Sequence, residues 1–311
     1  MLIADILAPR HNNSDRKGLH AAVNATGNTI TAIETVAPSF AISMQLAGAL
    51  KKSRFDAVIV HTNRQAIAAI SAKIIAEKNN AGYAIVYQPV RCEDTPHNIP
   101  PEVIEKVSLW IFEDEIQKKQ YAHLGVPEER SKILPPTSFD AENIGPITPA
   151  KYAGHTALNL LWIGEITDYQ LLRNAVDAIR QLPETAISFT ICGTGKARCI
   201  MPIVRDTRAD KGHTYIWRGN EYEIRQELGK AHILIAEKTY FTATQIECMR
   251  CGLPVYQAIG TSTLRDNLAA IAADPEVLRA AHQGTRQAYQ DTYNPLFHVK
   301  QFIEFIAEAT K

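Results

Sequence analysis

Residues 245–255 read Gln-Ile-Glu-Cys-Met-Arg-Cys-Gly-Leu-Pro-Val. Glu247 lies near the start of the helix that this pattern predicts, where a carboxylate complements the positive helix end. Gly252 suits a left-handed C-terminal cap, and Pro254 prevents the helix from continuing. The stretch therefore predicts a helix that ends at a tight turn and leads directly into a strand.

The segments before this stretch predict a parallel sheet. Strands are expected at residues 157–164, 186–195, 215–219 and 232–236, because these runs are short and apolar, and the first three end in Gly. Helical spacing of apolar residues predicts helices between them, at 171–179 and 221–231. Strands that alternate with helices form parallel sheets, and such sheets bind ligands beyond the carboxyl ends of their strands.

The N-terminal half has the same alternation. Strands are expected at residues 2–8, 54–61, 83–88, 107–112 and 131–136, and a helix at 64–78. Residues 139–155, rich in Pro, Gly and Thr, predict a linker. We therefore expect two domains, at 1–138 and 156–294, with a final helix at 295–311 that packs back on the first domain.

Composition agrees with an ordinary globular protein. The chain has 311 residues, of which 46% are hydrophobic, and its 33 basic residues balance 33 acidic ones. The apolar start, Leu2 to Ala8, contains Asp5 and is too short to span a bilayer. Five cysteines, an odd number, favour reduced thiols in a cytoplasmic protein. Cys248 and Cys251 form a Cys-x-x-Cys, for which core packing is the preferred interpretation.

Together these segments resemble the retaining glycosyltransferases of family 4, most closely over residues 157–264. As in that family, a Gly follows the first strand of the C-terminal half, a Gly-x-Gly the second and an aromatic-x-Gly the third. In the family a Glu at the position of Glu247 holds the ribose hydroxyls of the donor. The resemblance implies an α/β protein of the GT-B fold, with two Rossmann-like parallel-sheet domains facing a cleft.

The resemblance also implies a reaction. A hexosyl- or pentosyltransferase of this kind moves a sugar from a nucleotide diphosphate to an acceptor hydroxyl, with retention of configuration and without metal or tightly bound cofactor. The expected donor is a UDP-sugar, and the expected acceptor is a glycan or a lipid-linked glycan. The leaving diphosphate helps to deprotonate the acceptor, so the protein mainly positions the reactants and stabilises phosphate charge.

The C-terminal domain is expected to bind the donor. The candidate nucleotide-binding residues are Gly164, Gly193, Gly195, Lys196, Arg218, Lys238, Phe241, Thr242, Ala243, Thr244 and Glu247. For Gly193 to Lys196 a tight strand-to-helix turn is the default interpretation, because the run is too short for a P-loop. An exposed turn lysine is likewise more often solvated than a ligand.

Two departures from the family concern the same site. Thr239 stands eight positions before Glu247, where the family has an acidic residue, and the nearest carboxylate is Glu237. Residues 164–170 contain no Lys or Arg, whereas the family has a cation pair there for the diphosphate. The expected substitutes are Lys196, Lys238, Arg218 and Arg10, with backbone N–H groups at the start of the helix.

In the N-terminal domain, His61 and Gln88 end two predicted strands and are the candidate catalytic residues, together with Glu237 and Thr239. A lone His is more often a hydrogen-bonded structural residue than a catalyst. Residues 9–18 predict a loop over the cleft, whose Arg10, Arg16 and Lys17 are candidate acceptor contacts. A solvated surface loop is the alternative.

Two other functions stay open. The basic loop also fits a phage DNA glycosyltransferase acting on hydroxymethylated bases, because such enzymes share the GT-B architecture. The missing cations and Thr239 also fit an inactive GT-B protein that binds a nucleotide or a partner as a scaffold.

Overall fold

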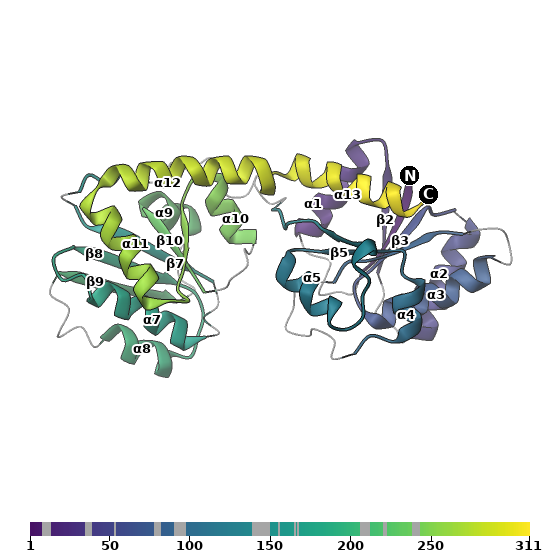
Figure 1. Ribbon diagram of the computed structural model, residues 1–311, viewed down its shortest axis with the longest axis horizontal. Coiled ribbons are helices and arrows are strands. Elements are labelled where there is room, and N and C mark those ends of the chain that lie inside the picture. The colour runs from purple at the N-terminus through teal and green to yellow at the C-terminus, as the bar shows by residue number, and fades with distance from the viewer. Residues whose placement is uncertain are drawn as a thin grey trace. The chain divides into compact units, whose positions relative to one another are not determined.

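The computed structural model describes residues 1–7, 14–34, 39–52, 54–77, 82–89, 98–138, 150–154, 156–164, 166, 168–205, 212–219, 223–237 and 243–311. The chain divides into two compact units. Unit 1 comprises Met1–Asp140 and Asn294–Lys311, and unit 2 comprises Ala141–Tyr293. Each unit contains a parallel sheet covered by helices on both faces (Figure 1). The predicted α/β class with two parallel sheets is therefore confirmed.

Within the described ranges, unit 1 has a six-stranded parallel sheet of order β2-β1-β3-β4-β5-β6. Its strands are β1 (Leu2–Leu7), β2 (Thr29–Glu34), β3 (Ala57–Val60), β4 (Ala84–Tyr87), β5 (Leu109–Phe112) and β6 (Ser131–Ile133). Its helices are α1 (Ser14–Ala25), α2 (Ser39–Lys52), α3 (Asn63–Glu77), α4 (Pro101–Lys106), α5 (Glu115–Ala122), the 3-10 turn η2 (Glu128–Arg130) and α13 (Pro295–Ala309).

The two faces of this sheet have separate cores, because successive side chains of a strand point to opposite faces. One core joins Val58, Ile85 and their neighbours to α2, α3, α4 and α5. The other joins Ile59 and its neighbours to α1 and α13. The C-terminal helix α13 thus supplies Val299, Phe302 and Ile306 to a core that begins with Ile3 of β1.

In the part of unit 2 that the structure describes, five parallel strands have the order β11-β10-β7-β8-β9. They are β7 (Leu158–Ile163), β8 (Ile187–Cys192), β9 (His213–Gly219), β10 (Ile233–Ala236) and β11 (Val255–Gln257). The helices are α7 (Tyr169–Arg180), α8 (Ala197–Arg205), α9 (Ile224–Lys230), α10 (Ala243–Arg250), α11 (Thr261–Ala273), α12 (Pro275–Ala288) and the π-helical turn η4 (Tyr289–Tyr293).

The strand orders locate a switch point in each sheet. In unit 1 the chain goes from β1 to β2 on one side and then to β3 on the other. In unit 2 it goes from β7 to β8 and β9 on one side and then to β10 on the other. Ligands of open α/β sheets bind in the crevice that such a reversal opens at the carboxyl ends of the strands. The β1/β3 and β7/β10 edges are therefore where a site is expected.

The structure confirms the predicted strands and helices, with their ends shifted by a few residues. The prediction of a loop at residues 9–18 is wrong in part. Helix α1 begins at Ser14, so Arg16 and Lys17 are helical. The physical reason is the spacing of Leu19, Ala22 and Val23, which places an apolar stripe against the sheet core.

Candidate functional site

The carboxyl ends of three adjacent strands of unit 1 carry polar side chains on one face. Asp5 is on β1, His61 follows β3 and Gln88 follows β4. Each stands two residues after an aliphatic residue of the core under α1 and α13, namely Ile3, Ile59 and Val86. Because strand side chains alternate with period two, the three polar side chains share the face of that core.

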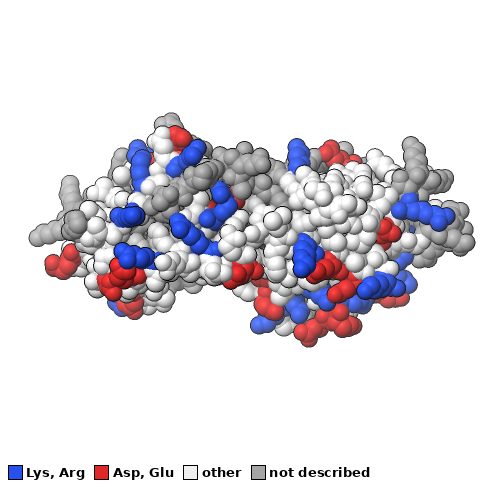
Figure 2. Space-filling model, turned by 90° about the horizontal axis from the view of Figure 1, so that it is seen from above, with Lys and Arg blue, Asp and Glu red and all other residues white. Residues whose placement is uncertain are grey.

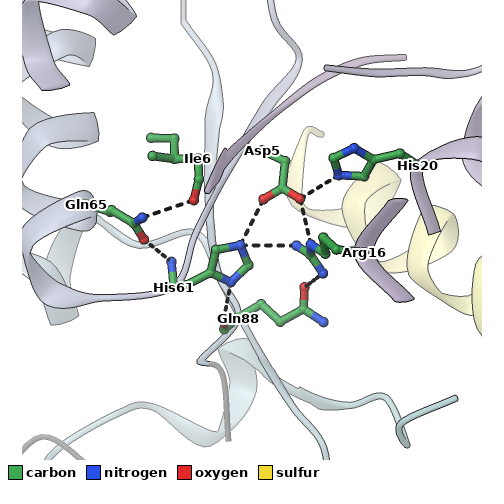
Figure 3. Close-up of polar contacts among 7 residues, drawn as sticks. All are labelled: Asp5, Ile6, Arg16, His20, His61, Gln65 and Gln88. Carbon is green, nitrogen blue, oxygen red and sulfur yellow. Dashed lines mark hydrogen bonds and ion pairs between the residues drawn. The ribbon is translucent and has the colours of Figure 1, made fainter. Parts of the chain in front are cut away.

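Asp5 is the centre of a buried ion-pair network (Figure 3). Its Oδ2 accepts from Nε of Arg16 at 2.7 Å and from Nε2 of His20 at 2.8 Å. Its Oδ1 lies 2.9 Å from Nε2 of His61. Burial alone would raise the pKa of Asp5, but Arg16 and His61 together hold it well below its usual range. Asp5 is therefore a carboxylate with partners on both oxygens.

Arg16 and His61 close the network with Gln88 (Figure 3). The NH1 group of Arg16 donates to Oε1 of Gln88 at 3.0 Å, and its NH2 group lies 3.2 Å from Nε2 of His61. Nδ1 of His61 lies 2.6 Å from the carbonyl oxygen of Gln88. Because a carbonyl only accepts, this ring nitrogen carries a proton.

Gln65 anchors the same network to the sheet. Its Oε1 accepts from the backbone N–H of His61 at 2.8 Å, and its Nε2 donates to the carbonyl oxygen of Ile6 at 3.1 Å. His61 thus uses both ring nitrogens and its backbone N–H inside the unit, and it is 5% exposed. This geometry matches the structural interpretation of His61.

The two described acceptor candidates, Arg16 and Lys17, have different environments. Arg16 is mostly buried and engaged by Asp5, whereas Lys17, the next residue, is exposed. Arg10 lies outside the described residues. A helix directs residues that follow one another to different sides, which is why neighbouring cations have different environments.

The switch point of unit 2 is bridged by Glu237. This residue follows β10 and is 8% exposed. Its Oε1 accepts from the backbone N–H of Asp168, and the Asp168 side chain in turn caps α7 by accepting from the N–H of Gln170 at 2.8 Å. Carboxylates, rather than a cation pair, therefore occupy the start of α7.

The glycine loop after β8 packs against the loop after β7. A Cβ at Gly193 would overlap the carbonyl oxygen of Gly164, and one at Gly195 would meet Ile166 and Ile200. The N–H of Ile166 donates to the carbonyl oxygen of Thr194 at 2.8 Å. These glycines are needed for close approach of two backbone loops, in line with the tight-turn interpretation.

The other predicted donor contacts are of three kinds. Lys196 and Arg218 are exposed, and the backbone N–H of Lys196 donates to the Tyr169 hydroxyl at 2.6 Å. Ala243 is the first residue of α10, and Thr244 is half-buried in its first turn. Lys238, Phe241 and Thr242 lie outside the described residues, as does the catalytic candidate Thr239.

Glu247 is buried in the second turn of α10 and is 2% exposed. Its Oε2 accepts from Nε of Arg250 at 2.7 Å. Its Oε1 is buried and has no hydrogen-bond partner in the part of the chain that the structure describes. A buried acceptor without a partner costs about 1–3 kcal/mol, so a functional explanation is called for.

Sequence reasoning missed Asp5 and His20. The signal for Asp5 was present: a charged residue inside an apolar strand, in phase with Ile3, predicts a buried charge that needs partners. His20 and Arg16 lie four residues apart on α1, which places both on the side facing Asp5. The error in the loop at residues 9–18 hid this spacing.

Charge is distributed without a dominant sign on the face drawn in Figure 2, where acidic groups lie among the basic ones. Among the described residues, no group of three or more His, Cys, Asp and Glu side chains is placed to hold a metal ion. Cys192, Cys199 and Cys248 are free thiols. None of the helices that the structure describes is long and apolar enough to cross a membrane.

The sequence matches no family model, and a search of curated proteins gives no match. Solved structures nevertheless share the fold. A glycosyltransferase from Rickettsia africae superposes with a TM-score of 0.75 at 12% identity, over 100% of this chain and 98% of that one. The lipopolysaccharide outer core galactosyltransferase WaaB gives 0.72 at 15% identity, over 99% of each chain.

A third structure, Anabaena HepE in complex with UDP-glucose, gives a TM-score of 0.67 at 11% identity, over 99% of this chain and 100% of that one. Identities this low establish the architecture alone. The protein thus has the GT-B fold expected from its sequence.

Proposed function

We propose that the protein is a glycosyltransferase that moves a sugar from a nucleotide-diphosphate donor to an acceptor hydroxyl. Unit 2 binds the donor nucleotide, and unit 1 binds the acceptor. The observation that supports this proposal above all is the buried carboxylate of Glu247, whose Oε1 lacks a partner in the described part of the chain. A ribose hydroxyl is a donor that would satisfy this oxygen.

Three further observations support the same site. Glu247 lies on the helix that follows β10, beside the switch point of unit 2. The segment from Gln245 to Val255 resembles the ribose-binding segment of family 4 glycosyltransferases. HepE, which shares the fold, was solved with UDP-glucose. We therefore propose a UDP-sugar as donor, a glycan or lipid-linked glycan as acceptor, and retention of configuration.

In this mechanism the chain mainly orients the reactants. The acceptor oxygen bonds to the anomeric carbon as the bond to the diphosphate oxygen breaks, and the acceptor proton passes to the leaving diphosphate. Lys196 and Arg218 are the described cations proposed to stabilise the phosphate charge. The Asp5 network then keeps the acceptor side rigid, because its members are held by one another.

The test begins with binding. Calorimetry with UDP, GDP, ADP, CDP and dTDP should identify one nucleotide that binds wild type. Glu247→Ala should weaken that binding about 10- to 150-fold, since a hydrogen bond to a charged group contributes about 1.5–3 kcal/mol. The matched control is Glu276→Ala, which removes the carboxylate of an exposed Glu–Arg pair on α12. Equal effects of the two variants would remove Glu247 from the site.

Activity is tested with the corresponding nucleotide-sugar. Release of nucleotide diphosphate with transfer of the sugar supports the proposal, and NMR of the product reports retention or inversion. A second candidate, a nucleotide-binding protein without transferase activity, is favoured by the carboxylates at the start of α7. Tight nucleotide binding without turnover across glycan acceptors would establish that candidate.

A DNA acceptor is tested separately. Titration of duplex DNA at several salt concentrations should show no binding, because Arg16 is engaged by Asp5 and the chain has no net charge. A steep salt dependence that weakens in Lys17→Ala would reinstate the DNA acceptor.

A further inference from the structure

Helices α2 and α3 lie side by side on one face of the sheet of unit 1, and their outer side exposes large apolar side chains (Figure 1). Met44 of α2 is 57% exposed, and the consecutive Ile74 and Ile75 of α3 are 56% and 43% exposed. A single exposed apolar residue is common on a protein surface, but a group of them on neighbouring elements marks a site of interaction.

The two helices present these side chains on one outer face. They run in the same direction, because each connects parallel strands of the same sheet. Oγ of Ser43 donates to the carbonyl oxygen of Ala68 at 3.2 Å, so these two residues lie at the same level. Met44 follows Ser43 directly, and Ile75 lies about two turns after Ala68. The outward residues between Met44 and Ile75 are small and uncharged, namely Ala47, Gly48 and Ser71.

The segment that carries this face is basic. From Ser39 to Glu77, the start of α2 to the end of α3, the sequence has five basic residues and two acidic ones. The carboxylate of Asp56, one of the two acidic residues, accepts from the backbone N–H of Leu2 at 2.7 Å. Residues 98–130 of the same unit, which include α4 and α5, have seven acidic and four basic residues instead. The basic residues of the first segment are Lys51, Lys52, Arg54, Arg64 and Lys73.

This combination of apolar and basic residues indicates which partner the face fits. In a symmetric dimer the same face would meet itself, so basic residues would face basic residues across the interface, which is unfavourable. The surface of a membrane with anionic lipids attracts each Lys or Arg, and exposed Met and Ile side chains enter the boundary between headgroups and acyl chains. Charge therefore favours an anionic lipid surface over a second copy of the chain.

We propose that the outer face of α2 and α3, formed by Met44, Ile74 and Ile75 together with Arg54 and Lys73, docks on the surface of a membrane that contains anionic lipids. The face belongs to unit 1 and includes no residue of the proposed donor site. The inference therefore goes beyond the proposed function and does not depend on sugar transfer. Docking would bring unit 1, the proposed acceptor-binding unit, to the surface where a lipid-linked glycan is anchored.

The experiment is co-sedimentation of the full chain with lipid vesicles in the absence of nucleotide. One set of vesicles consists of phosphatidylcholine alone, and the other of equal parts of phosphatidylcholine and phosphatidylglycerol. Wild type should bind the anionic vesicles at least about tenfold more strongly, because each basic residue near an anionic surface contributes about fivefold. High salt should remove most of this difference, since exposed charges are screened.

Two variants separate the apolar from the basic contribution. The triple variant Met44→Ser, Ile74→Ser and Ile75→Ser should lower binding to anionic vesicles at least about tenfold, because its side chains no longer enter the acyl boundary. The double variant Arg54→Gln and Lys73→Gln should lower the same binding by about 10- to 30-fold and leave binding to neutral vesicles unchanged.

A matched control removes three exposed apolar side chains from other helices, by Ile116→Ser, Val277→Ser and Leu296→Ser. It should bind vesicles as wild type does. Absence of binding to anionic vesicles by wild type, or equal losses for the triple variant and this control, would overturn the inference. Sedimentation velocity that shows a dimer of wild type and a monomer of the triple variant would assign the face to a second copy and overturn it as well.

These outcomes are distinct from a failure of the proposed function, because no measurement in the series uses a nucleotide-sugar. Loss of vesicle binding in the variants with unchanged nucleotide affinity would support the lipid surface as a separate site. If the triple variant does not fold, as judged by circular dichroism, the double variant and the salt series still decide.

Discussion

The two units place a buried carboxylate beside the switch point of their sheets, but they treat it differently. Asp5 in unit 1 has partners on both oxygens, supplied by Arg16, His20 and His61. Glu247 in unit 2 has Arg250 on one oxygen, and the structure describes no partner for the other. A saturated network can be explained by folding alone, whereas a buried oxygen without a partner cannot.

The difference assigns separate roles. The Asp5 network ties β1, α1, β3 and the end of β4 together, so its loss should be felt in stability. Glu247 contributes one internal ion pair and one unused acceptor, so its loss should be felt mainly in binding. Substitutions on the two sides test whether folding and ligand recognition are divided in this way.

The largest expected effect is on the stability of unit 1. Asp5→Asn keeps the shape of the side chain but leaves Arg16 without its buried counter-charge, which should lower the free energy of unfolding by about 3–5 kcal/mol. Urea denaturation followed by circular dichroism measures this loss. Asp266→Asn, which breaks an exposed Asp–Arg contact, is the control and should change stability by less than about 1 kcal/mol. A similarly small change at Asp5 would show that the network does not stabilise the fold.

Whether the sequence predicts such a network depends on how far apart its residues lie along the chain. The parallel sheets and the strand ends of His61 and Gln88 follow from local periodicity, and the structure confirms them. Asp5 meets His61 because β1 pairs with β3 in the sheet. In the sequence, β2 and two helices separate these two strands. Which cation then faces Asp5 depends on where α1 begins, and element boundaries are the least predictable feature of a sequence.

Unit 2 shows the same limit. The position of Glu247 on a helix before Gly252 could be predicted from local signals alone. Its partner Arg250 lies on the same helix, but no sequence rule says whether such a pair is buried. The hydrogen bond from the N–H of Asp168 to Glu237 joins residues 69 positions apart, and it depends on β10 pairing with β7. Local sequence signals therefore do not predict the contacts between loops of neighbouring strands, and only the structure shows them.

The second-largest effect is on the stability of the fold at acidic pH. Each unit has a buried histidine that tests it. Burial, with a smaller contribution from Arg16, lowers the pKa of His298 to about 4, against a hydrogen bond to the carbonyl oxygen of Pro135 that raises it. The folded state therefore binds fewer protons than the unfolded state below pH 6.5. Stability should fall from pH 6.5 down to about 4, by roughly 3 kcal/mol in total, and this contribution is constant above pH 6.5.

His298→Asn tests this in unit 1, because an Asn amide can still donate to the carbonyl oxygen of Pro135. The variant should match wild type at pH 7 and lose less stability between pH 6.5 and 5. Burial, together with the neighbouring His282, likewise lowers the pKa of His232 in unit 2 to about 4, and its Nδ1 accepts from the N–H of Asn159. His123→Asn, at an exposed position, is the control. Identical acid profiles for His298→Asn and wild type would contradict the assignment.

A smaller effect is expected at Glu237, the carboxylate that bridges the switch point of unit 2. Glu237→Ala removes the acceptor for the N–H of Asp168 and should lower the free energy of unfolding by about 1–3 kcal/mol. Glu237→Gln keeps an acceptor oxygen and should lose less than half of that. Turnover of the nucleotide-sugar by the Gln variant separates a structural role from a catalytic one. Full stability with abolished turnover would make Glu237 catalytic.

The smallest effect on folding is expected at Lys196. The same substitution is the sharpest test of where the donor phosphates bind. Its side chain is exposed, so Lys196→Ala should change the free energy of unfolding by less than about 0.5 kcal/mol. If Lys196 contacts the donor diphosphate, affinity for UDP should fall about two- to fivefold, as is typical of an exposed charge pair, while affinity for uridine stays the same. High salt should reduce the difference between wild type and variant, because exposed charges are screened.

Arg218→Ala, the other exposed cation at a strand end of unit 2, is the comparison variant. A loss for UDP in one variant and not in the other would locate the phosphates at the end of β8 or of β9. Equal losses for uridine and UDP would mean that the substituted residue supports the nucleoside rather than its phosphates. No loss in either variant would mean that neither exposed side chain takes the charge. The start of α10, where the N–H groups of Ala243 and Thr244 have no partner within the described part of the helix, would then be the next place to test.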